Sequence, residues 1–91
     1  MTKEEAIKRA TDLEAKIDAN IEKVRAKSKN EAKILEYEER SLKLLTGELQ
    51  TATKEQVIAH LESRLAKAEQ RVEDIFKKVE GTTDAPTTAA P

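Results

Sequence analysis

The sequence predicts an all-α fold, an antiparallel helical hairpin with coiled-coil-like packing. Apolar residues recur every three or four positions along two long segments, as on one face of a helix. Capping-box patterns open both segments, at Thr2 and at Thr53. Gly47 and Gly81, the only glycines, follow the two apolar runs, where glycine commonly ends a helix. We therefore expect one domain at 1–81, with a helix over about 3–46, a turn over 47–53 and a helix over about 54–80.

The composition fits long helices better than a bulky globular core. Aromatic residues make up 2% of the 91 residues, whereas charged residues make up 38%. Helices that each bury one narrow apolar stripe need few large side chains. The formal net charge of −1 creates no overall field that would attract nucleic acid or an anionic membrane.

The sequence contains no signal for a membrane, a signal peptide or a thiolate site. Cysteine is absent, which excludes disulfides and cysteine-bound metals. The N-terminus is charged from Lys3 onward, and no stretch approaches the roughly 20 apolar residues that span a bilayer. We expect a cytoplasmic protein with no membrane association and no cofactor.

The first predicted helix carries an apolar stripe with an eleven-residue repeat. The stripe consists of Ala6, Ala10, Leu13, Ile17, Ile21, Val24, Ser28, Ala32 and Leu35. Such a repeat averages about 3.67 residues per turn, which favours a nearly straight stripe. Toward the predicted turn the stripe continues at heptad spacing through Leu42, Leu45 and Leu49, with Glu38 as its polar member.

Two parts of this helix depart from the simple stripe. Ile34, Tyr37 and Leu44 lie off its line, and we expect them to widen the apolar face into a more enclosed region near the turn. Ser28 and Glu31 match a further capping box, and a break there would give three helices in a small bundle. Because the eleven-residue register runs through Ser28 without a phase change, and no glycine or proline marks the site, we favour a continuous helix.

The second predicted helix is more regular. Its apolar seam alternates spacings of three and four residues through Ile58, Leu61, Leu65, Ala68, Val72, Ile75 and Val79. The remaining segment, 82–91, contains threonine, proline and alanine without a bulky apolar residue. Since such a segment buries too little surface to offset its ordering entropy, we expect a disordered tail.

The unequal helix lengths predict a partner. At about 1.5 Å per residue the first helix spans roughly 66 Å and the second roughly 40 Å, so the first would project beyond the hairpin. An uncovered apolar stripe is normally buried by another surface. We expect a homo-oligomer, or another protein bound at the N-terminal helix, with the contact made by Ile7, Ala10, Leu13, Ile17, Ile21 and Val24.

A basic segment and a single histidine are the other candidate sites. The possible anion contacts are Lys23, Arg25, Lys27, Lys29 and Lys33. No aromatic residue lies among these side chains to stack on a base, so we interpret the segment first as a solvated helix flank. His60 has Gln56 and Arg64 as its neighbours one turn away and no carboxylate to support a metal, so we expect it to face solvent.

These patterns predict a non-enzymatic interaction or assembly module. The sequence has no cysteine nucleophile, no glycine-rich phosphate loop and no serine placed for activation by the histidine. A self-associating helical hairpin is typical of scaffolds, adaptors, virion-assembly factors and inhibitors. The alternative is a nucleic-acid-associated regulator that uses the basic segment 23–33, although the charge balance argues against nucleic acid as the main partner.

Overall fold

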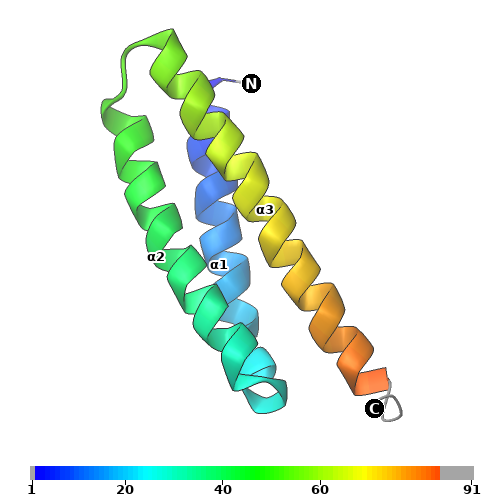
Figure 1. The fold of residues 1–91 in the computed structure, drawn as a ribbon. Helices are drawn as coiled ribbons and strands as arrows, with labels where there is room; N and C mark the ends of the chain where they lie inside the picture. Colours follow the sequence, from blue (N-terminus) through cyan, green and yellow to red (C-terminus); the bar gives the residue numbers. More distant parts are fainter. Residues whose placement is uncertain (1, 85–91) are drawn as a thin grey trace.

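The chain forms three helices. The computed structural model describes residues 2–84, and the side chains of residues 2–80. Helix α1 covers Lys3–Lys27, α2 covers Lys29–Thr51 and α3 covers Glu55–Asp84. Figure 1 shows α2 folding back antiparallel to α1, and α3 returning antiparallel to α2 so that it runs parallel to α1. The all-α prediction is confirmed, whereas the predicted two-helix hairpin is wrong.

The first helix predicted over 3–46 breaks at Ser28. This residue has φ −155° and ψ 109°, an extended conformation that interrupts both helices. Its backbone N–H donates to the carbonyl of Val24 at 2.7 Å, and its hydroxyl accepts the backbone N–H of Glu31 at 3.3 Å. Ser28 therefore closes α1 and caps α2 at once, so the capping-box pattern at this site marks a real helix start.

Burial explains why the chain bends despite an unbroken helical register. A one-residue interruption removes a few helical hydrogen bonds, at about 0.5–1.5 kcal/mol each. A straight helix would leave Leu13, Ile17, Ile21 and Val24 without cover from α2, and burying each contributes on the order of 1.5–3 kcal/mol. Since all four are at most 9% exposed in the folded chain, the gain exceeds the loss.

The two glycines were predicted to end helices, but both lie inside a helix. Gly47 lies inside α2, because Leu45 and Leu49 on either side of it continue the buried stripe to Thr51. Gly81 lies inside α3, which continues to Asp84, since glycine is also compatible with a right-handed helix. The turn is consequently shorter than the predicted 47–53 and separates Thr51 from Glu55.

The core runs along the axis of the bundle between the three helices. Each helix contributes one stripe: Ala6, Ala10, Leu13, Ile17, Ile21 and Val24 from α1, Ala32, Leu35, Leu42, Leu45 and Leu49 from α2, and Leu61, Leu65, Ala68, Val72, Ile75 and Val79 from α3. These are the apolar positions that the periodicity predicts, apart from the partly buried Ile58. The resulting bundle is elongated, with Cα extents of 50 × 18 × 17 Å.

The ends of the helices are tied down by specific bonds. Thr2 and Glu5 form the predicted capping box, with Thr2 N–H donating to the Glu5 carboxylate at 2.7 Å and Glu5 N–H to the Thr2 hydroxyl at 3.1 Å. Lys3 Nζ donates to the carbonyl of Ala52 at 2.7 Å, which joins the start of α1 to the end of α2. Of the predicted tail, 82–84 belong to α3 and 85–91 lie outside the described residues.

Candidate functional site: the outer face of helix α2

The six residues predicted to bind a partner lie inside the bundle. Ala10, Leu13, Ile17, Ile21 and Val24 are buried, and Ile7 is partly buried against the same cluster. α2 folds back along α1, and salt bridges and hydrogen bonds hold the start of α1 to the other two helices. The expectation that this stripe is uncovered is therefore wrong, and the side chains stabilise the fold.

The basic segment predicted between residues 23 and 33 does not form a single surface. Lys23 and Lys27 lie on α1 and line a groove beside α3. Arg25 turns to another side of α1, where it pairs with acidic side chains of α1 and α2. Lys29 and Lys33 follow the break and are exposed on α2. The change of chain direction at the break thus separates the five charges into groups on different helices.

The groove beside Lys23 and Lys27 is open and already partly engaged within the chain. It lies between the C-terminal parts of α1 and α3 and has a volume of about 290 Å³. Lys16 Nζ lies 5.4 Å from the centroid of the Phe76 ring, a cation–π arrangement across the groove. Glu80 contributes a negative charge to the same wall. The groove is therefore lined by three lysines and one glutamate, and one of the lysines, Lys16, is already engaged with Phe76.

Two glutamates of α2 are buried against α3. Lys78 Nζ lies 2.9 Å from the Glu31 carboxylate. Arg71 binds Glu38 through two bonds, Nε to Oε2 at 2.8 Å and Nη2 to Oε1 at 3.0 Å. These bonds raise the pKa of Arg71, which stays charged. The buried carboxylates are thus neutralised by cations that reach over from α3.

The other acidic residues of α2 also turn toward neighbouring helices. Glu36 accepts a hydrogen bond from Arg25 of α1 at 2.6 Å, and Glu48 lies 3.3 Å from Arg64 of α3. Glu39 faces α1, as described below. Every acidic side chain of α2 is consequently directed to a partner within the chain.

Asp18 of α1 and Glu39 of α2 bring two carboxyl groups together. The hydrogen bond to Asp18 raises the pKa of Glu39, and burial and the negative charge of Asp18 raise it further. The nearby Glu14 acts in the same direction, whereas Lys43 lowers the pKa. The protonated form of Glu39 is therefore favoured in the folded chain, because its ionised form lies against the negative charge of Asp18.

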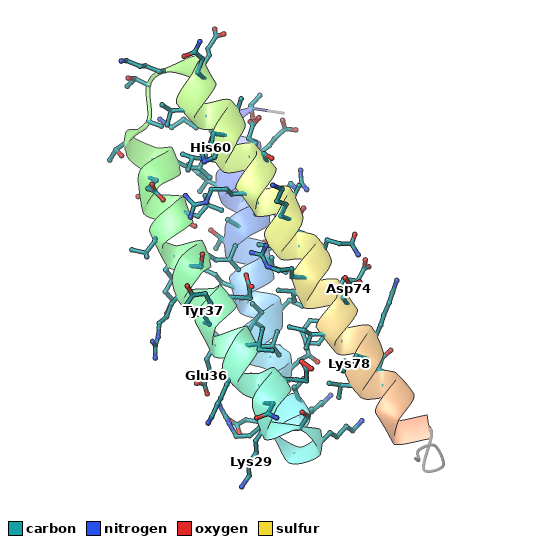
Figure 2. All side chains as sticks on the ribbon, viewed as in Figure 1. Lys29, Glu36, Tyr37, His60, Asp74 and Lys78 are labelled. Carbon is teal, nitrogen blue, oxygen red and sulfur yellow. The ribbon has the colours of Figure 1, made fainter. Side chains whose placement is uncertain are left out.

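The outward side of α2 combines exposed apolar residues with cations. Tyr37 and Leu44 are each 70% exposed, and Ile34 is 43% exposed. Figure 2 shows Lys29 at the start of α2 and Tyr37 midway along it. In the part of the chain that the structure describes, no ion-pair partner is found for the four basic residues of α2. We define the α2 face as Ile34, Tyr37 and Leu44 with Lys29, Lys33 and Arg40.

The neighbouring edge of α3 extends this surface. Arg64, Arg71 and Lys78 recur every seven residues along α3 and all bond to glutamates of α2. Val57 occupies the preceding position of this heptad and is 44% exposed. The large exposed apolar side chains among the described residues therefore lie on α2 and on the edge of α3 beside it.

The α2 face was not among the sites predicted from the sequence. Ile34, Tyr37 and Leu44 were expected to be enclosed near the turn, and their exposure shows that this expectation is wrong. The sequence did contain a signal for this exposure. Two residues along a helix correspond to a rotation of about 200°, so Leu44 lies on the side opposite the buried Leu42. The spacings of three and seven residues also put the three side chains on a seam of their own.

Three further features of the described residues bear on the candidate site. Residues 2–80 contain no group of three side chains arranged to hold a metal ion. His60 is exposed on α3, as predicted (Figure 2). None of the described helices is both long and apolar enough to cross a membrane. In comparisons with known proteins, no family model, no curated protein and no solved structure matches this chain.

Proposed function

We propose that this chain is a non-enzymatic protein–protein interaction module, of the scaffold, adaptor or assembly type, that recognises its partner through the α2 face. The observation that carries the proposal is the exposure of Ile34, Tyr37 and Leu44 on one side of a helix whose other apolar residues are almost fully buried. Scattered exposed apolar residues are common, whereas aligned ones on a single helix face are typical of a binding surface.

The polar chemistry supports binding rather than catalysis. The buried carboxylates, Glu31 and Glu38, are neutralised by Lys78 and Arg71 and are therefore not free to act as bases. The single histidine, His60, is exposed on α3. A catalytic site needs groups that converge on a concave pocket, whereas the α2 face is a convex helix surface.

Site-specific photo-crosslinking tests the proposed function. A photoreactive phenylalanine analogue replaces Tyr37 in one variant and Ala19, which is exposed on α1, in a control variant. In cells we expect a discrete protein adduct from position 37 and none from position 19. Equal labelling from both positions, or no adduct from position 37, would contradict the proposal.

The alternative of a nucleic-acid-associated regulator has one observation in its favour. Tyr37 is exposed between Lys33 and Arg40, so a base can stack on its ring while the cations contact phosphate. This function predicts retention on single-stranded RNA or DNA at low salt that is lost when Lys33 and Arg40 become glutamine. Absence of retention at low salt removes this alternative.

A further inference from the structure

The apolar part of the α2 face has the geometry of a helix-docking seam. Ile34, Tyr37 and Leu44 follow one another at spacings of three and seven residues, and the small polar Ser41 occupies the position between Tyr37 and Leu44. This pattern spans about 15 Å along the helix, a length that three turns of a partner helix can cover. Helical partners recognise such surfaces with anchors at the same spacings. The seam therefore fits an amphipathic helix laid along α2.

The charges around the seam select an acidic partner. Lys29, Lys33 and Arg40 are exposed beside the seam, while the acidic residues of α2 are directed to partners within the chain. The edge of α3 adds Arg64, Arg71 and Lys78 beside the seam, although each is shared with a glutamate of α2. The surface offered to an incoming helix is thus basic, and complementary potential favours acidic flanks.

Gly47 gives independent support for a closely approaching partner. A glycine within a helix costs about 1 kcal/mol relative to alanine. A Cβ atom added at Gly47 would have nothing within 4 Å, and no glycine of the described backbone has a positive φ. The fold of the single chain thus gives no reason for glycine here. A residue without a side chain next to Leu44 and Glu48 does allow the backbone of another molecule to come close.

The same charges disfavour a second copy of the chain as the occupant. In an antiparallel pair of α2 helices that places Tyr37 opposite Leu44, the symmetry axis passes between Arg40 and Ser41. Arg40 then lies beside Arg40 of the copy, which is a repulsive contact. Lys33 would approach Glu48 of the copy, but that carboxylate is already paired with Arg64.

We propose that the α2 face binds an amphipathic helix with acidic flanks that belongs to another protein. This inference rests on the proposed function and specifies the chemistry of the partner. The apolar anchors of that helix contact Tyr37 and Leu44, and its carboxylates contact Lys33 and Arg40.

A charge-swap experiment tests the proposal. The probe is a synthetic helical peptide of about 20 residues, with leucines at spacings of three and four and glutamates on both flanks, and a second peptide carries lysines in place of the glutamates. We expect the full chain to bind the acidic peptide. The double variant Lys33→Glu, Arg40→Glu should lose about tenfold or more in affinity and should bind the basic peptide instead. A matched control, Lys67→Glu with Lys77→Glu on α3, should bind the acidic peptide as the unmodified chain does.

The remaining outcomes separate this inference from the proposed function. Tyr37→Ser with Leu44→Ser should abolish peptide binding while the helical circular dichroism spectrum is kept. Failure of the acidic peptide to bind, together with a protein adduct from position 37, overturns the acidic-helix inference and leaves the interaction function standing. The unmodified chain could also have a solution mass of twice 10.2 kDa that falls to 10.2 kDa in the Tyr37→Ser, Leu44→Ser variant. That result would overturn the acidic-helix inference in favour of a second copy of the chain. Retention of the chain on nucleic acid would overturn the acidic-helix inference as well, if the Lys33→Glu, Arg40→Glu variant lost that retention.

Discussion

Two single residues of α2 affect the free energy of unfolding in ways that their neighbours in sequence do not. Gly47 lies in a regular helix with open space around it, whereas Glu39, two turns earlier, is held against a second carboxyl group. Neither residue belongs to the apolar core. Both nevertheless change the free energy of unfolding, because one carries excess backbone entropy in the unfolded chain and the other carries a repulsion in the folded chain.

Gly47→Ala should stabilise the folded chain. Alanine fits the helical backbone here without a clash and restricts the unfolded chain, so we expect a gain of about 0.4–1 kcal/mol in the free energy of unfolding. Urea denaturation followed by circular dichroism measures it. Ala19→Gly, at an exposed position of α1, should show a loss of similar size. A destabilised Gly47→Ala variant would show that the glycine serves the fold and not an approaching partner.

Asp18→Asn should stabilise the chain at neutral pH and less so in acid. The pKa of Glu39 is raised in the folded state, so the folded chain binds this proton more tightly than the unfolded chain does. The stability from this contact is therefore present at low pH and is lost as the pH rises above the ordinary glutamate value of 4.5 and through the raised pKa. An asparagine amide donates to Glu39 without repulsion.

Thermal and urea unfolding across pH 4 to 7 would measure this effect, in roughly the range where glutamate titrates. We expect the difference between Asp18→Asn and the unmodified chain to grow with pH, to at most about 1 kcal/mol, because the pair is largely solvated. Asp12→Asn is the control, since it removes an attraction to Lys8 at 2.9 Å and should not stabilise the chain. A pH-independent difference would contradict the raised pKa of Glu39.

At the scale of helices, α2 and α3 are joined by ion pairs whose burial differs. Glu38 is buried, with 6% of its side chain exposed, and Arg71 covers it with two hydrogen bonds. The pair between Glu48 and Arg64 is exposed on both sides. Removing one partner is costly where the other stays buried, whereas an exposed pair contributes little.

Arg71→Ala should therefore destabilise the chain more than Arg64→Ala. The loss of Arg71 leaves a buried carboxylate without its cation, at a cost of about 1–3 kcal/mol, against at most about 1 kcal/mol for Arg64. Glu38→Leu should be neutral or stabilising, because an apolar side chain at this position extends the core. Equilibrium urea unfolding of the three variants gives the order. Equal losses for the two arginine variants would show that Glu38 is solvated when Arg71 is absent.

For the whole molecule, the bend at Ser28 decides which side chains face water. By folding α1 back onto α2, it covers the stripe from Ala6 to Val24 and leaves the α2 face as the exposed apolar surface. Burial and the proposed binding role thereby fall on opposite sides of the same helix. Leu42 is 1% exposed and lies in the core, while Leu44 is 70% exposed on the α2 face.

Leu42→Ala and Leu44→Ala should separate these two roles. The first leaves a cavity in the core and should lower the free energy of unfolding by about 2–5 kcal/mol. The second changes an exposed position and should stay within about 0.5 kcal/mol of the unmodified chain. Denaturation measures both, and only Leu44→Ala should weaken binding of the acidic peptide with the fold intact. A large loss of stability in Leu44→Ala would place this residue in an intramolecular contact.

The sequence by itself determined the helical character of this chain, the capping box at Thr2 and the apolar stripe that each helix buries. These depend on interactions within a few turns, which periodicity and capping residues reveal directly. Only the tertiary structure decided that the first helix ends at Ser28, that Gly47 continues α2 and that Tyr37 and Leu44 stay exposed. The capping pattern at Ser28 is compatible with a continuous helix and with a break. The break prevails because burying the stripe of α1 against α2 yields more free energy than the lost hydrogen bonds cost, and that balance involves residues far apart in the sequence.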